Sequence, residues 1–168
     1  MKRTRKGFTL VELLVVIGII GVLGAMGLIG GKEANNIATA TKIVEDFHII
    51  SAAMDMYYSD NKSEIDKDGG STIDGEKIAK ALEAYVKKNS SKIVGKDQNA
   101  GQFLVTVTAA STTASMQWWL SYLLDDGESG VAKILANKAK QENFKTSNTG
   151  DTDYTAATAN KSVFYQVR

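Results

Sequence analysis

Residues 2–31 of the chain read KRTRKGFTLVELLVVIGIIGVLGAMGLIGG. A basic leader ends at Gly7, and the long uncharged run that follows is interrupted by one acid, Glu12. In a helix, residues 8–31 would extend about 36 Å, which is enough to cross a bilayer core of roughly 30 Å. The leader cations predict that the N-terminus stays on the cytoplasmic side of the membrane and that the chain beyond Gly31 lies outside the cytoplasm.

The junction between leader and apolar run, KGFTLVEL at residues 6–13, resembles the processing motif of type IV prepilins. It has the family's glycine, then an aromatic residue, then an acid four positions later within a long apolar run. The resemblance implies that a prepilin peptidase in the inner membrane cleaves after Gly7 and methylates the new N-terminal residue, Phe8. A secretory signal cleaved by ordinary signal peptidase is the alternative, but the apolar run is longer than such signals usually have.

Glu12 is the costly residue of this segment. An ionised carboxylate within a bilayer costs roughly 2.5 to 3.5 kcal/mol on insertion scales, so it is taken as functional by default. If cleavage frees the amine of Phe8, an ammonium and a carboxylate must both be buried, and two subunits packed side by side could pair them. The resemblance implies the same assembly role, with Glu12 meeting the Phe8 amine of a neighbouring subunit. A stray acid near the membrane interface is the alternative.

Glycine recurs through the segment, and the positions that we expect to affect helix flexibility are Gly18, Gly21, Gly24, Gly27, Gly30 and Gly31. A spacing of three shifts each position by about 60° around a helix, so these glycines do not form one stripe. Each lowers helix preference by up to about 1 kcal/mol relative to alanine, which predicts local unwinding once the helix leaves the membrane. The alternative is that glycine is simply frequent in membrane helices.

The chain is predicted to have four parts. Residues 1–7 are the cleaved leader, 8–31 the transmembrane and filament-core helix, 32–58 its amphipathic continuation, and 59–168 a globular head. The continuation is indicated by apolar residues at helical spacing that include Ile37, Phe47 and Tyr58. The predicted fold class is α+β, with the long helix packed on a small, mainly antiparallel sheet that carries extra short helices, as the resemblance also implies.

Periodicity assigns further elements within the head. It predicts helices over residues 76–89, 116–124 and 131–140, and strands over residues 102–108 and 162–168. Residues 59–75 and 141–160 are predicted to be loops because they are polar and lack an apolar period. Trp118 and Tyr122 are predicted to pack in the core or at its boundary, with an exposed interface role as the alternative.

Composition argues against several classes of function. The absence of cysteine excludes thiol chemistry and the disulfide that closes a C-terminal loop in many pilins. The one histidine, His48, lies within a helical pattern, which predicts a packing or solvated role. Residues 64–76 fit a calcium loop poorly, because Gly75 stands where the bidentate acid should be. We therefore predict no catalytic residue, no cofactor and no metal site, and a protein that is not an enzyme.

The charge balance gives no sign of a nucleic-acid site. Without the four leader cations, 16 basic residues stand against 19 acidic ones, whereas surfaces that bind nucleic acid are usually strongly basic.

The resemblance to type IV prepilins implies a structural subunit of a type IV pilus. Such a subunit is inserted in the bacterial inner membrane as a precursor, and the pilus assembly machinery adds it to a homo-oligomeric helical filament at the cell surface, which serves adhesion, motility or DNA uptake. A pseudopilin of a type II secretion or competence system is the alternative, since it shares the leader and the helix. A membrane-tethered binding protein would need neither Gly7 before Phe8 nor the acid at Glu12.

Overall fold

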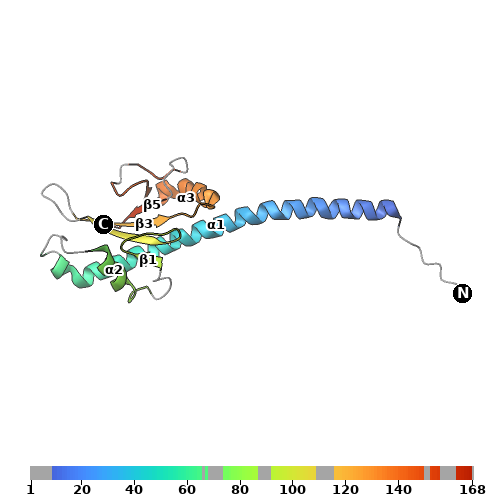
Figure 1. Ribbon diagram of the computed structural model, residues 1–168. Helices are drawn as coiled ribbons and strands as arrows, with labels where there is room; N and C mark the ends of the chain where they lie inside the picture. Colours follow the sequence, from blue (N-terminus) through green and yellow to red (C-terminus); the bar gives the residue numbers. More distant parts are fainter. Residues whose placement is uncertain are drawn as a thin grey trace.

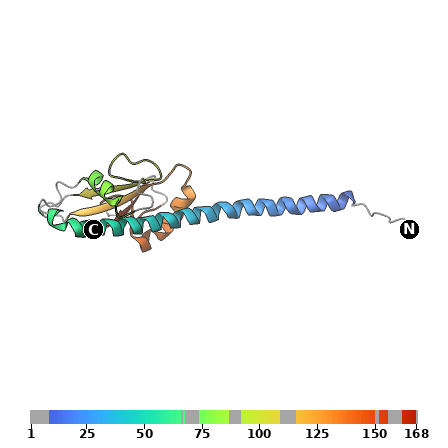
Figure 2. The same cartoon turned by 90° about the horizontal axis from the view of Figure 1, so that it is seen from below.

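The structure is a computed structural model that describes residues 9–65, 67, 74–86, 92–108, 116–149, 152–155 and 162–167, apart from the side chains of residues 27–29. Figure 1 shows one long helix whose N-terminal half stands free of a head, while its C-terminal half lies along the head. The view turned by 90° in Figure 2 shows the same separation. The fold is α+β, as the sequence predicts.

The long helix, α1, runs without interruption over Leu10–Ile65. Its 56 residues extend about 84 Å at 1.5 Å per residue. The helix passes through the predicted boundaries at residues 31 and 58 without a break, and it continues into the region that we predicted to be loop from Ser59. The described side chains of α1 are exposed from Leu10 to Asn35, and the helix buries one face against the head from Ala40 onward.

The head contains a five-stranded sheet in the order β1-β2-β3-β5-β4. The short strand β1 pairs in parallel with β2, and all other pairs are antiparallel, so the sheet is mainly antiparallel as predicted. Within the described part of the head there are also two shorter helices, with α2 in contact with β1, β2 and α1, and α3 in contact with β4 and α1. The bounds are β1 Ile93–Val94, β2 Phe103–Thr108, β3 Gln117–Leu123, β4 Phe144–Lys145, β5 Ser162–Gln166, α2 Gly75–Leu82 and α3 Ser129–Glu142.

The core lies between α1 and the sheet, and Phe47 is at its centre. The Phe47 ring meets Phe103 of β2 edge-on at a centroid distance of 5.1 Å and lies at the same distance from Phe144 of β4. Burial of an aromatic side chain of this size contributes on the order of 2 kcal/mol or more. Apolar side chains one to two turns away on α1 complete its buried face: Ala40, Ile43, Val44, Ile50, Ala53 and Met54.

The prediction of a helix over residues 116–124 is wrong, because this segment forms the central strand β3. Trp118 and Leu120 face the core beside α1, while Trp119 and Ser121 are buried on the other side of the strand. A strand that is buried on both faces has a continuous apolar run, and such a run contains helical spacing by accident. Trp118 and Tyr122 are buried, which confirms the prediction that they belong to the core.

Other predicted boundaries differ in extent. The helix predicted over residues 76–89 is α2, which begins one residue earlier at Gly75 and ends at Leu82, where a turn follows. The predicted loop at residues 59–75 therefore includes the last residues of α1 and the first of α2, while residues 66 and 68–73 lie outside the described part. The predicted loop at residues 141–160 contains β4 and buried Tyr154. The strand predicted over 102–108 and the helix predicted over 131–140 are confirmed as β2 and α3, and the C-terminal strand is β5.

Two glycines let α2 lie directly against the sheet. A Cβ atom at Gly75 would lie 2.5 Å from the carbonyl oxygen of Val105, and one at Gly95 would collide with the backbone of Gly75 and Glu76. Neither obstacle is a flexible side chain, so the backbones could not remain this close with any other residue. The N-cap of α2 is Asp74, whose side chain accepts a hydrogen bond from the Glu76 amide.

Candidate assembly site at the start of the long helix

The first turn of α1 is closed by reciprocal hydrogen bonds between Thr9 and Glu12. The Glu12 carboxylate accepts from the Thr9 amide at 2.8 Å and from the Thr9 hydroxyl at 2.9 Å. In return, the Glu12 amide donates to Thr9 Oγ1 at 3.2 Å. This is the arrangement of a capping box, in which the residue before the helix and the acid three positions later satisfy each other's free amides. It places the carboxylate at the positive end of the helix dipole.

The role of Thr9 was missed by our reading of the sequence. The signal was present, because a threonine followed three residues later by glutamate, just before an apolar run, is the sequence pattern of a capping box. Two other predicted site residues, Gly7 and Phe8, lie outside the described residues. Cleavage after Gly7, methylation of Phe8 and pairing of Glu12 with that amine therefore stay predictions.

Beyond this turn, α1 presents apolar side chains to all sides. The large apolar residues from Leu10 to Met26 are between 46% and 79% exposed, and none contacts the head closely enough to be buried. Among the described residues, α1 is the one helix that is long and apolar enough to cross a membrane. So large an exposed apolar surface is unstable in water and must be covered by lipid or by other protein chains.

The glycines of this segment lie in unbroken helix. A Cβ atom added at Gly18, Gly21, Gly24, Gly30 or Gly31 would meet nothing within 4 Å. These glycines are therefore not required by close packing within the chain, and the space beside them is open to a neighbouring molecule. Gly27 is helical too, but its surroundings are not described. Unwinding of residues 18–31 within a filament stays a prediction.

Titratable groups elsewhere on the described chain are arranged as structural contacts. The Nε2 atom of His48 lies 2.9 Å from a carboxylate oxygen of Glu142, so this pair links the exposed side of α1 to the last residue of α3. Among the described residues, no group of three or more His, Cys, Asp or Glu side chains could hold a metal ion. The predicted poor fit of a calcium loop concerns residues that lie largely outside the described part.

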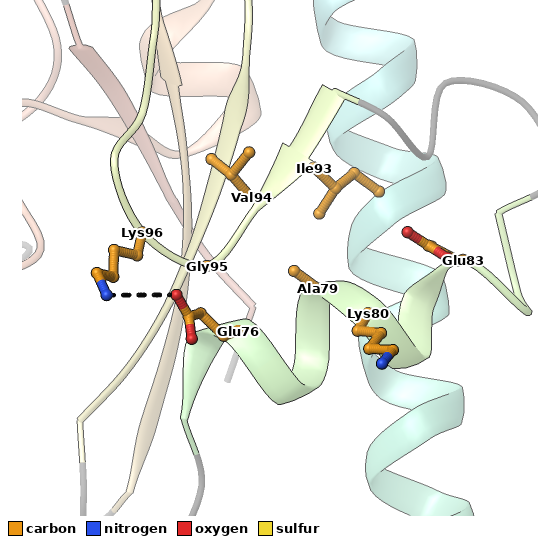
Figure 3. A pocket seen from close by; sticks show the side chains of 8 residues that line it. All are labelled: Glu76, Ala79, Lys80, Glu83, Ile93, Val94, Gly95 and Lys96. Carbon is orange, nitrogen blue, oxygen red and sulfur yellow. Dashed lines mark ion pairs between the residues drawn. The ribbon is translucent and has the colours of Figure 1, made fainter.

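A shallow groove of about 390 Å³ lies between α2 and the edge strand β1 (Figure 3). Its rim carries Glu76, whose carboxylate lies 3.5 Å from the ammonium of Lys96. Lys80 and Glu83 are exposed at the far end of the same groove, so the charges of its rim balance. No histidine or cysteine lines the groove, and its two acids, Glu76 and Glu83, are exposed to water. The groove therefore has no activated nucleophile and no buried general base.

Comparison with known families gives a match to the segment that contains Thr9 and Glu12. Residues 2–28 match a family model described as the prokaryotic N-terminal methylation motif. The chain carries the signature of type IV pilins and pseudopilins. No curated protein and no solved structure matches the chain.

The motif has implications for processing and location. It implies processing by a prepilin peptidase and handling by a pilus assembly machinery. The motif and the exposed apolar helix are consistent with anchoring in the inner membrane. The type IV pilin-like family in which this motif occurs is structural and not enzymatic.

Proposed function

We propose that this pilin-like chain is the repeated subunit of a type IV pilus. In this proposal the precursor is held in the inner membrane by residues 8–31, is cleaved after Gly7 and methylated at Phe8, and is then moved into a helical filament at the cell surface. The observation that carries the proposal is the combination of the methylation motif with an exposed apolar helix that begins at the Thr9–Glu12 contact.

The exposed helix supports assembly over simple anchoring. A tethered protein needs an apolar span, but it has no need of an acid inside that span. Glu12 is tolerable in the precursor because the Thr9 amide and hydroxyl already donate to its carboxylate. A carboxylate can accept about four hydrogen bonds, so these two leave capacity for the ammonium of a neighbour's Phe8. The contact then favours one stagger of subunits over others, which is the role for which buried ion pairs have the best support.

The head carries a loop near the C-terminus, residues 146–152, whose base is held by several contacts. The ammonium of Lys145 lies 2.6 Å from a carboxylate oxygen of Asp153, and backbone hydrogen bonds join Thr146 to Thr152 and Tyr154 to Phe144. These contacts close the base of the loop without a disulfide. Adhesion, motility and DNA uptake are all compatible with such a head, and a pseudopilin of a secretion or competence system is the alternative function.

The experiment that tests the proposal is mass spectrometry of fibres sheared from cells that produce the chain. We expect long fibres in which this polypeptide is the main component and begins at methylated Phe8. A trace species in the cell envelope that secretion requires would instead support a pseudopilin. Fibres whose subunits retain residues 1–7 would refute the processing step.

A further inference from the structure

The chain contains three Asp-Gly sequences, and the structure describes two of them, Asp74–Gly75 and Asp126–Gly127. In such a sequence the backbone nitrogen of the glycine can attack the carboxyl group of the aspartate side chain, because glycine has no Cβ atom to obstruct the approach. The two described sequences lie in opposite surroundings, so the structure indicates which of them is free to react. The third, Asp68–Gly69, lies outside the described residues.

Asp126 and Gly127 form the centre of the turn that joins β3 to α3. The turn is closed by the Glu128 amide, which donates to the carbonyl oxygen of Asp125 at 3.1 Å. Asp126 and Gly127 are both exposed, and a Cβ atom added at Gly127 would meet nothing within 4 Å. The peptide unit between them therefore has open space in which to rotate towards the Asp126 carboxyl group.

Asp74 and Gly75, by contrast, are held in place by packing and capping. Asp74 is the N-cap of α2, and its carboxylate accepts a hydrogen bond from the Glu76 amide at 3.3 Å. Gly75 is buried, and a Cβ atom added to it would lie 2.5 Å from the carbonyl oxygen of Val105. The peptide unit between Asp74 and Gly75 therefore cannot rotate towards the Asp74 carboxyl group while α2 is packed on the sheet.

We propose that Asp126–Gly127 is a site of spontaneous isomerisation, at which the chain becomes linked through the Asp126 side chain. The Gly127 nitrogen forms a bond to Cγ of the protonated Asp126 carboxyl group and gives up its proton, and the hydroxyl group leaves with that proton as water. The proximity of the two groups favours this ring closure. Water then opens the succinimide ring. Cleavage of the bond between nitrogen and Cγ restores aspartate, whereas cleavage of the bond between nitrogen and the main-chain carbonyl carbon leaves isoaspartate with no change in mass.

Isomerisation would loosen the start of α3, because it adds one carbon atom to the main chain just before that helix. The start of α3 is closely fitted to α1, since a Cβ atom added at Gly130 would collide with the side-chain amide of Asn36. In the first turn of α3, the Ala132 amide donates to the carbonyl oxygen of Glu128 at 2.9 Å. A longer connection from β3 lets this end of the helix shift, so isomerised chains hold α3 less firmly against α1.

Prolonged warm incubation of the purified full-length chain in detergent, at mildly acidic pH, tests the proposal. Isoaspartate is located by mass spectrometry of peptides with electron-transfer fragmentation, which distinguishes the two linkages, while circular dichroism verifies that the chain stays folded. We expect isoaspartate to accumulate several-fold faster at Asp126 than at Asp74 in the folded chain. In urea the two sites should react at similar rates, because packing then protects neither of them.

Two variants test the atoms assigned to the reaction. Gly127→Ala should slow isomerisation at Asp126 several-fold and leave Asp74 unaffected, because the added Cβ atom obstructs the attacking nitrogen. Asp126→Glu should give no isomerised product at this position, because the longer side chain would have to close a six-membered ring. An unchanged rate in Gly127→Ala would overturn the assignment of the attacking atom.

The folded chain itself supplies the decisive comparison. Equal accumulation of isoaspartate at Asp126 and Asp74, or none at Asp126, would overturn the proposal. Faster hydrogen exchange of the Ala132 amide in the isomerised fraction is the expected effect on α3, and equal exchange in both fractions would overturn that consequence. The reaction needs no second molecule, so every one of these outcomes leaves the proposed function intact.

Discussion

Thr9 and Glu12 bind each other in both directions at the point where the long helix begins, with the Thr9 amide 2.8 Å from the Glu12 carboxylate and the Glu12 amide 3.2 Å from the Thr9 hydroxyl. The acid that looks isolated in an apolar sequence is therefore a partner in a local contact. This contact explains how the carboxylate can exist before assembly, and it separates two roles of Glu12 that substitutions can distinguish.

Glu12→Gln should separate the capping role from the role of the charge. Glutamine can replace glutamate in a capping box, so the first turn of α1 should stay intact while the pairing with an ammonium is lost. We expect normal amounts of the processed chain in the membrane and a loss of fibres, measured by immunoblot of membranes and of sheared material. Glu12→Ala should do the same and in addition weaken the helix start by about 1 kcal/mol.

Thr9→Ala is the matched control for that experiment. It removes the hydroxyl from the capping box but leaves the Glu12 charge in place, so we expect fibres to form, in reduced amount. Full fibre formation by Glu12→Gln would contradict the role of the charge.

Gly95→Ala should destabilise the head, because the new Cβ atom would meet the backbone at the start of α2. Overpacking of this kind costs about 1 to 3 kcal/mol, and here the obstacle cannot rotate away. Thermal unfolding of the full-length chain in detergent, followed by circular dichroism, measures the effect. Gly127→Ala is the control, because nothing lies within 4 Å of its added Cβ atom, and its effect should stay within about 0.5 kcal/mol. Equal stability of the two variants would contradict the close packing of α2 on the sheet.

Acid should loosen the C-terminal loop through Asp153. The hydrogen bond and the charge of Lys145 hold the pKa of Asp153 below its ordinary value. The pair therefore contributes to stability at pH values above the ordinary aspartate pKa, and this contribution is lost as the pH falls through the lower pKa of the folded state. Hydrogen exchange of the Thr146 and Tyr154 amides should show reduced protection in Asp153→Asn at neutral pH and little difference between the two proteins in strong acid. Unchanged protection at neutral pH would show that the ion pair does not hold the loop.

At alkaline pH, the phenol of Tyr122 should ionise at a higher pH than an ordinary tyrosine does. Burial, with the nearby negative charges of Glu128, Asp46 and Asp125, raises the pKa of Tyr122 to about 12. In the unfolded chain the same phenol ionises near its ordinary value of about 10, so the free energy of unfolding should fall as the pH rises from about 10 through 12. Ultraviolet titration of the chain and of Tyr122→Phe should differ by one group in that range. If the group that Tyr122→Phe removes from the titration ionises near pH 10, the burial of Tyr122 is contradicted.

The sequence predicted those parts of the structure that depend on local pattern. The free half of α1 follows from a long run without charge, and the packed half follows from apolar spacing around Phe47. The central strand β3 could not be recognised in this way, because Trp118 and Trp119 are buried on opposite faces and the pattern of one buried side is lost. The Lys145–Asp153 pair was also beyond sequence analysis, because it depends on how two short segments are brought together at the edge of the sheet.

The candidate site was predicted only in part from the sequence. Glu12 was recognised because an acid is costly in an apolar segment, and its partner Thr9 was overlooked although the spacing of a capping box was present. Ile37 was assigned to the packed face of α1 but is half exposed, because the head begins only at about Ala40. The exposure of Ile49 and Met56 was not recognised either, since it depends on which face of α1 the sheet covers.

The most direct test of the central claim is a cryo-microscopy map of native fibres that resolves the first turn of α1. We predict that the Phe8 nitrogen of one subunit lies within about 4 Å of the Glu12 carboxylate of an adjacent subunit, as an ion pair requires. A map in which every Glu12 carboxylate lies far from any neighbouring Phe8 nitrogen would contradict the account.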